Sequence, residues 1–211
     1  MKLESIGIII GIRPFGERDA VARIFTRDHG VLAGMIKGAQ TAKKNRPLVG
    51  QCGNASWNAR LDCQLGVFHF ESDRNLAAPL MSAGRALACM NSAFALLAAM
   101  LPEREPYPDL FENTVGMLAS ISRDYTDWEI RLLRALGYAL DLSKCSNCGR
   151  DDDLKFLSKR TGRAVCSDCA APYIDKVFPL PIGLATTEFF LSRAAADMGA
   201  KLPVERTIIS K

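Results

Sequence analysis

The chain has 211 residues, of which 48% are hydrophobic and 24% charged, and its formal net charge is +4 at pH 7. This composition is typical of an ordinary soluble globular protein, and the length allows one large domain or two to three small ones. The longest mostly apolar run, 86–101, is short for a membrane span and predicts a buried helix. The start lacks a signal-peptide cleavage pattern, so we expect a cytoplasmic protein with reduced thiols.

The positive charge is concentrated in one stretch. Between Ile12 and Gly50 the sequence has eight basic residues and three acidic ones, so this stretch carries +5 and the rest of the chain sums to −1. Such a stretch attracts phosphate groups, but a solvated basic face without a ligand has the same composition. Charge alone leaves both interpretations open.

Residues 1 to about 75 have the pattern of short strands. Residues 20–26 alternate, for example, with Val21, Arg23 and Phe25 on one face. Five such segments, separated by polar or glycine turns, predict a small closed barrel with a basic loop between the third and fourth strands. The segments are 5–13, 20–26, 31–38, 54–61 and 65–71.

Residues 82 to about 142 change to helical spacing. Residues 82–101 are apolar nearly all round, as expected for a central helix, and apolar side chains recur at helical spacing in 107–121 and 128–140. We therefore predict three helices that bury a core as a bundle. A further amphipathic helix is predicted at about 182–198, packing back on the bundle.

Two Cys-x-x-Cys pairs follow, separated by 17 residues. Two such turns joined by a short loop can surround one tetrahedral zinc ion. Because four thiolates leave no open coordination position, we predict a structural site, with loose thiols, two disulfides or a redox pair as the alternatives. The predicted ligands are Cys145, Cys148, Cys166 and Cys169, whereas Cys52, Cys63 and Cys89 are expected to be free thiols in or near the core.

Local residues suit a zinc module. Gly149 follows the first pair and can adopt the positive φ that such a turn needs. Thr161–Gly162 breaks the intervening loop, which predicts a hairpin that pairs 154–157 with 163–165.

No motif indicates an enzyme. The sequence has no recognisable nucleophile motif, no GxxxxGKS phosphate loop and no HExxH motif, so no catalytic residue is expected. Two other classes stay open from the residues alone. One is a zinc-containing nuclease or glycosylase, and the other is a zinc-ribbon transcription factor or a protein-only adaptor.

Several segments, in order, resemble the bacterial recombination mediator family RecO. The opening GIIIGIRPFGERDAVARIFTRDHGVLAGMIKGAQTAKKNRP contains the turn Phe15–Gly16–Glu17 and the sequence Lys37–Gly38–Ala39 followed by basic residues. The segments ARLDCQLGVFHFE, WEIRLLRALGYALDLSKCSNCG and SKRTGRAVCSDCAAPY are also similar to the family. The resemblance extends from about residue 5 to 200. Some relatives lack part of the set of four cysteines, whereas this chain keeps all four.

The resemblance implies a multidomain α+β protein with an N-terminal five-stranded OB-fold barrel, a central α-helical bundle and an inserted four-cysteine zinc module. The expected parts are an OB-fold DNA-binding domain at 1–78, a helical domain at 79–142, the zinc module at 143–178 and a C-terminal helix packing on the helical domain at 179–211.

The resemblance also implies a function. RecO-like proteins bind single- and double-stranded DNA, anneal complementary strands and contact the C-terminal tail of single-stranded DNA-binding protein. They work with RecR, and sometimes RecF, to load RecA. We therefore expect a non-enzymatic mediator of recombinational repair that holds a structural Zn²⁺, has no membrane partner and associates with the nucleoid during repair.

Basic residues are the candidate DNA contacts, because Lys and Arg can each neutralise a phosphate without reading sequence. The main candidates lie in the basic loop, with three arginines in support: Lys37, Lys43, Lys44 and Arg46, then Arg13, Arg18 and Arg27. Arg18 and Arg23 could instead pair with acids nearby in the sequence, namely Glu17, Asp19 or Asp28. A second basic cluster in the zinc loop, which either extends the DNA path or is a solvated hairpin, comprises Lys155, Lys159, Arg160 and Arg163. Three aromatics are either core or base-stacking residues: Phe15, Trp57 and Phe68.

Overall fold

The computed structural model describes residues 1–41, 46–60, 65–119 and 121–209, with only the backbone described at 121–124. By the distances between Cα atoms the chain divides into two compact units. The first comprises Met1–Arg123 and Pro203–Ile209, and the second Asp124–Leu202. The four-part domain division expected from the sequence stays a prediction.

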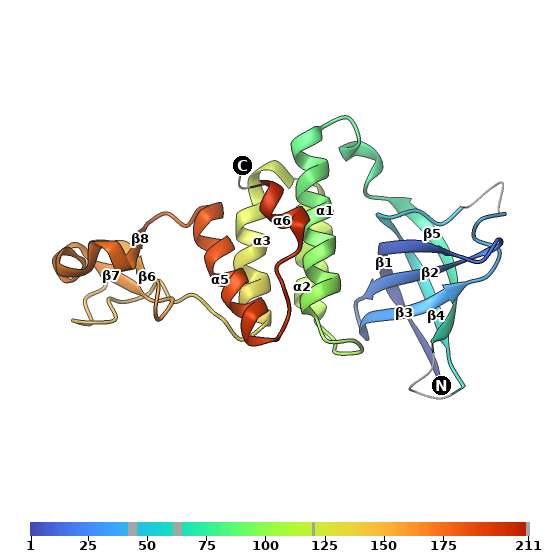
Figure 1. Cartoon of the computed structure of the whole chain (residues 1–211), viewed down its shortest axis with the longest axis horizontal. Coiled ribbons are helices and arrows are strands. Elements are labelled where there is room, and N and C mark those ends of the chain that lie inside the picture. Colours follow the sequence, from blue (N-terminus) through green and yellow to red (C-terminus); the bar gives the residue numbers. More distant parts are fainter. Residues whose placement is uncertain (42–45, 61–64, 120, 210–211) are drawn as a thin grey trace. The chain divides into compact units, whose positions relative to one another are not determined.

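The first unit begins with a closed five-stranded barrel, drawn in blue to cyan in Figure 1. The strand order is β1-β2-β3-β5-β4, with β3 and β5 parallel and β4 also paired with β1. This order and closure are those of an OB-fold, which confirms the predicted fold. The strands are β1 (Lys2–Phe15), β2 (Asp19–Thr26), β3 (Gly30–Ile36), β4 (Gln51–Asn58) and β5 (Gly66–Asn75).

Trp57 closes the barrel interior. Its side chain is 1% exposed, and its indole N–H donates to the Ala33 carbonyl at 2.9 Å. Gly66 makes room for the ring, since a Cβ at this position would lie 2.1 Å from the indole. The Arg104 guanidinium lies 4.9 Å from the ring centroid, a distance typical of a cation–π contact. Trp57 is therefore held in the barrel core by a hydrogen bond, a close glycine and a cation.

Strand β2 is buried on both faces, which its alternating sequence does not show. Ala22 and Ile24 point into the barrel. On the other face Phe25 makes an edge-to-face contact with Phe111 of the helical part of this unit, at a centroid separation of 5.6 Å. Only Arg23 is exposed on that face.

Four helical elements complete the first unit: η1 (Ala78–Leu80), α1 (Gly84–Met100), α2 (Pro108–Ala119) and α6 (Val204–Ile209), of which α6 packs against α1. Helix α1 ends because Leu101 precedes a proline and is extended, with ψ of 132°. Helix α2 begins at Pro108, whose fixed φ suits a first helical position. None of the helices in the described part of the chain is long and apolar enough to cross a membrane.

The second unit combines helices with a small three-stranded sheet in the order β7-β6-β8. The buried Thr187 hydroxyl of α5 donates to the Glu129 carboxylate of α3, so these two helices pack together. The hairpin predicted around Thr161–Gly162 is present, whereas β8 was not predicted. The elements are α3 (Ile121–Ala135), whose first residues belong to the first unit, β6 (Leu154–Ser158), β7 (Ala164–Cys166), α4 (Ser167–Ala170), η2 (Ala171–Lys176), β8 (Val177–Pro179) and α5 (Leu184–Asp197).

Candidate metal centre and nucleic-acid interface

The two Cys-x-x-Cys pairs come together in the second unit. The first pair lies in a turn in which the Gly149 N–H donates to the Cys145 carbonyl at 2.9 Å, and Gly149 has the expected positive φ of 79°. In the second pair, Cys166 ends β7 and Cys169 lies in α4. Strand pairing sets Cys166 opposite Leu154, and the Ser146 N–H of the first pair donates to the Ala164 carbonyl of β7 at 2.8 Å, which holds the two pairs side by side.

The four sulfur atoms fit one metal ion. All lie within 4.8 Å of one another, and the Sγ atoms of Cys148 and Cys166 are 3.7 Å apart. Four thiolates at about 2.3 Å around a tetrahedral zinc would be about 3.8 Å apart, so small shifts would complete the geometry. The cluster is therefore able to hold a metal ion.

Two of the thiols in the cluster have pKa values that are shifted in opposite directions. Burial disfavours the Cys145 thiolate, but backbone N–H groups, chiefly that of Cys148, outweigh it and lower the pKa of Cys145 from 9.0 to about 6. The Cys169 N–H favours the Cys166 thiolate, but burial and the neighbouring thiols oppose it more strongly and raise the pKa of Cys166 to about 12. A divalent cation would offset the repulsion and let the thiols ionise together.

The cluster is part of a very small core. The buried residues around it are two of the cysteines with Val165, Ala170 and Val177. Beside them, the Arg150 guanidinium pairs with the Asp168 carboxylate at 3.0 Å, and this ion pair links the first Cys-x-x-Cys turn to the second. So few apolar side chains contribute little burial free energy, which is the situation in which a structural metal stabilises a module.

A second candidate site lies on the barrel, where the β1–β2 turn meets the segment after β3. The Asp19 carboxylate accepts from the Gly38 N–H at 2.8 Å, and the Gln40 amide donates to the carbonyls of Gly16 and Asp19. These bonds fix the position of Lys37, which precedes Gly38 in the chain.

Three of the predicted DNA contacts gather at this end of the barrel together with one exposed aromatic. We call this group the hairpin rim; its members are Arg13, Phe15, Arg18 and Lys37. The three basic residues are exposed and have no ion pair with the acids in the described part of the chain. Because side chains alternate along a strand, Arg13 and Phe15 lie on the same face of β1. The rim therefore offers positive charge and a ring to solvent.

The burial of the aromatic side chains separates the two roles that the sequence left open. Trp57 and Phe68 are 1% and 4% exposed and belong to the barrel core. Phe15, in contrast, is 56% exposed at the end of β1. Only Phe15 of the three presents a ring on which a base could stack.

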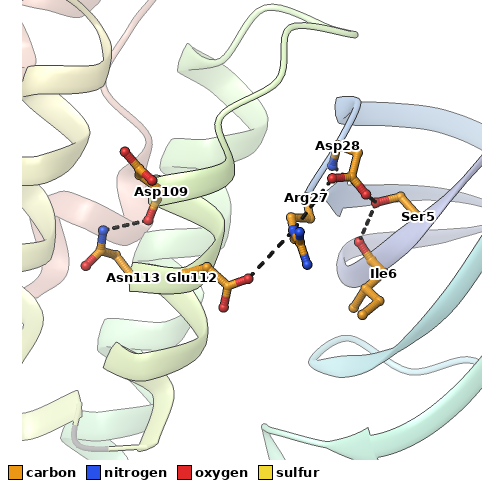
Figure 2. A network of polar contacts seen from close by, with 7 residues as sticks. All are labelled: Ser5, Ile6, Arg27, Asp28, Asp109, Glu112 and Asn113. Atoms are coloured by element: carbon orange, nitrogen blue, oxygen red, sulfur yellow. Dashed lines mark hydrogen bonds and ion pairs between the residues drawn. The ribbon is translucent and has the colours of Figure 1, made fainter.

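Arg27 lies at the opposite end of β2 from the hairpin rim, roughly 25 Å away along an eight-residue strand. Figure 2 shows its guanidinium beside Asp28 and Glu112, at N···O distances of 3.6 and 3.9 Å. A hollow of about 460 Å³ nearby is lined by further acids, including Glu4 and Glu71. The structure therefore does not bring Arg27 together with the rim, and its surroundings are acidic.

The remaining loop candidates are less well placed. Lys43 and Lys44 lie outside the described residues. Arg46 is exposed, and its carbonyl accepts from the Gln51 side chain at the start of β4. Of the other thiols, Cys52 and Cys89 are buried as expected, whereas Cys63 also lies outside the described part.

Two structural roles were missed from the sequence. Asp19 was expected only as a possible ion-pair partner of an arginine, but it anchors the backbone beside Lys37. Arg150 was not singled out, although its place directly after the first Cys-x-x-Cys turn and the acid in the second pair's spacer could have indicated the bridge.

Together, an OB-type barrel, a helical part and a four-cysteine cluster able to hold a metal define a multidomain α+β protein of the kind expected from the sequence. Comparison with known proteins agrees. A family model described as "Recombination protein O N terminal" matches residues 1–70, and one described as "Recombination protein O C terminal" matches residues 81–209. The chain belongs to the RecO family of DNA repair proteins.

Curated relatives match over nearly the full chain. The chain is 36% identical to "DNA repair protein RecO" of Ruegeria sp., covering 94% of this chain and 91% of that protein. It is 38% identical to the protein of the same name from Rhodospirillum centenum, covering 98% and 92%. For the Jannaschia sp. protein the values are 37%, 98% and 93%.

Proposed function

We propose that this protein is a non-enzymatic recombination mediator that binds DNA strands, anneals complementary single strands and helps load RecA onto DNA covered by single-stranded DNA-binding protein. The observation that carries the proposal is the hairpin rim, in which three exposed cations, without an ion pair among the described residues, share one end of an OB-type barrel with the exposed ring of Phe15. OB-folds commonly bind single strands by such a combination of charge and stacking.

The rim suits annealing for a physical reason. Two single strands repel each other because each carries one negative charge per nucleotide, and bound lysines and arginines neutralise part of that charge. Contacts to phosphates leave the base edges free to pair. In this proposal Lys43, Lys44 and Arg46 also contact phosphates, and Arg27 contributes least because Asp28 and Glu112 lie beside it.

The partners and the metal complete the proposal. We take RecR, the acidic tail of single-stranded DNA-binding protein and sometimes RecF as partners, as the family resemblance implies, with the tail in the helical part and the protein acting at the nucleoid in the cytoplasm. Cys145, Cys148, Cys166 and Cys169 would hold Zn²⁺. With four protein ligands the ion has no open position, so it stabilises the fold and takes no part in bond breaking.

The experiment is annealing of two complementary oligonucleotides, with fluorescence anisotropy of one labelled strand across a salt series. The native protein is compared with Lys37→Ala/Lys43→Ala/Lys44→Ala and with Arg13→Ala/Arg18→Ala/Lys37→Ala. The matched control, Lys2→Ala/Lys144→Ala/Lys201→Ala, removes the same number of charges elsewhere.

We expect the native protein and the control variant to anneal the strands faster than the strands anneal without protein. Log affinity should fall linearly with log salt concentration, and the slope should be shallower for both triple variants that remove candidate DNA contacts, by about 0.7 for each lost phosphate contact. The strands should stay intact in the presence of Mg²⁺. Absence of binding at low salt would overturn the proposal, and strand cleavage would overturn its non-enzymatic part.

A further inference from the structure

Two of the four cations in the basic cluster of the zinc loop are paired with acids, and a third has uncharged partners. Lys155 and Arg163 each pair with a neighbouring aspartate, at 2.8 and 3.2 Å. The Lys159 ammonium donates to a backbone carbonyl at 2.7 Å and lies over an aromatic ring. Arg160 is exposed and has no carboxylate partner in the described part of the chain. Among the described residues, Arg160 is therefore the one cation of the four whose charged group has no partner.

A second arginine joins Arg160 from a distant part of the sequence. The Arg193 guanidinium of α5 donates to the Arg160 carbonyl at 2.9 Å, which holds the two residues side by side. Arg193 also has no ion pair in the ranges described. The nearest acid on α5, Asp197, accepts instead from the Tyr138 hydroxyl at 2.9 Å. Neither arginine therefore forms an ion pair within the described residues, although the Asp197 carboxylate lies one helical turn from Arg193.

The two arginines line one hollow of about 180 Å³ in the second unit. Its other walls come from the segment after α3, which includes Tyr138 and Leu140, and from Phe190 of α5. Phe190 is only 4% exposed, so the apolar wall offers little room for an inserted side chain. The hollow is therefore defined chiefly by its two positive charges.

The zinc-loop hairpin holds Arg160 in place. Gly162 at the hairpin turn has a φ of 65°, and a Cβ there would lie 3.0 Å from the Leu140 side chain, so the turn packs closely on the segment after α3. Backbone hydrogen bonds from Asp141 to Gly162 and from Ala164 to Asp141 fix the same contact. Because β7 of this hairpin ends in Cys166, the four-cysteine cluster supports the arrangement of the arginines.

We propose that Arg160 and Arg193 form a phosphate-binding clamp for a nucleic-acid backbone, separate from the hairpin rim. Guanidinium groups bind phosphate oxygens bidentately, and two of them without a carboxylate can hold one phosphodiester. The small hollow and its buried apolar wall favour a phosphate over an acidic peptide with an apolar anchor. This inference rests on the proposed function and deepens it. Each compact unit then carries its own backbone contact, so one protein can hold two strands during annealing.

The test compares Arg160→Ala/Arg193→Ala with Lys144→Ala/Lys201→Ala, which removes the same charge from the second unit outside the hollow. Binding of one labelled strand, capture of a second non-complementary strand and the rate of annealing are measured at several salt concentrations. Metal content is measured for every variant, so that loss of the zinc module is recognised.

We expect the arginine variant to keep binding of the first strand, to lose second-strand capture and to anneal slowly. Any second-strand binding that remains should show a slope of log affinity against log salt that is shallower by about 0.7, because the two arginines together hold one phosphate. Native-like capture and annealing by this variant, alongside a native protein that binds and anneals, would overturn the clamp but leave the proposed function intact. Failure of the native protein to bind DNA would instead overturn the proposed function.

Hydrogen exchange gives a readout that needs no variant. Adding an oligonucleotide to the native protein should protect residues 158–163 and 190–197 as well as the hairpin rim. If these segments are protected by an acidic peptide and not by the oligonucleotide, the hollow is a peptide site and the phosphate clamp is wrong.

Discussion

The Asp19 carboxylate accepts a hydrogen bond from the Gly38 N–H at 2.8 Å and so ties the β1–β2 turn to the segment that carries Lys37. One acid thus organises a basic surface. Its negative charge opposes phosphate binding, whereas its hydrogen bond places a cation that favours it. These two effects have opposite signs, so a substitution can tell them apart.

We expect Asp19→Ala to weaken DNA binding severalfold, because the loss of the hydrogen bond frees the segment at Lys37. Fluorescence anisotropy with a labelled single strand measures the effect. The matched control is Glu17→Ala, which removes an exposed carboxylate from the same turn and should leave affinity unchanged or raise it. If both variants raise affinity equally, Asp19 acts only through its charge and has no positioning role.

Arg27 and Arg18 should differ as DNA contacts although both are exposed arginines of the basic stretch. Arg27 is near Asp28 and Glu112, which offset part of its charge, whereas Arg18 has no ion pair with any of the acids that the structure describes. We expect Arg18→Ala to lower the slope of log affinity against log salt by about 0.7 and Arg27→Ala to change it little. An equal reduction in the two variants would show that the acids do not neutralise Arg27.

The sequence predicted the features that depend on neighbouring residues. Alternation and turns indicated all five barrel strands, and the positions of Cys145, Cys148, Cys166 and Cys169 indicated a four-thiol cluster because each pair needs only one tight turn. The Gly149 turn followed from the same local reasoning.

Features that depend on distant contacts were not predictable in this way. Both faces of β2 are buried because Phe111, far along the chain, covers Phe25. Strand β8 has three residues, includes Pro179 and exists through its pairing with β6. Arg193 reaches Arg160 across 33 residues, and no local pattern marks it.

Removal of the first cysteine pair should release the metal. We expect Cys145→Ser/Cys148→Ser to lose one bound zinc per chain and to unfold the small sheet of the second unit, since its core holds few apolar residues. Elemental analysis and thermal melting with and without chelator measure this. Cys52→Ala, a change of a thiol outside the cluster, should keep the metal. An unchanged melting temperature with undiminished metal in the double variant would contradict a structural metal site.

Gly66 should be intolerant of a side chain. A Cβ there would lie 2.1 Å from the Trp57 indole, so Gly66→Ala must displace the ring from the barrel core. We expect the free energy of unfolding to fall by about 1–3 kcal/mol, as for other overpacked cores, in urea titrations. Gly84→Ala is the control, because a Cβ there meets nothing within 4 Å and alanine favours the helix. Equal stability of the two variants would contradict the close packing.

Cys52 should make the barrel less stable in alkaline solution. Burial is the main cause that raises the pKa of this thiol above 9.0, more than Arg74 nearby lowers it. Above pH 9 the unfolded chain therefore loses a proton that the folded chain keeps, and the free energy of unfolding falls as pH rises. Below pH 8 both states hold the proton, and the thiol adds no pH dependence.

Urea unfolding of the native protein and Cys52→Ala at pH 7.5 and 10 tests this prediction. The difference in the free energy of unfolding between the two proteins should shift with pH in favour of the variant, because only the native protein has the thiol. Other titrating groups, including the cysteine cluster, are common to both proteins and cancel in this difference. A difference that stays constant between the two pH values would show that the Cys52 thiol ionises at the same pH in the folded and unfolded chain, and that its burial in β4 does not affect its pKa.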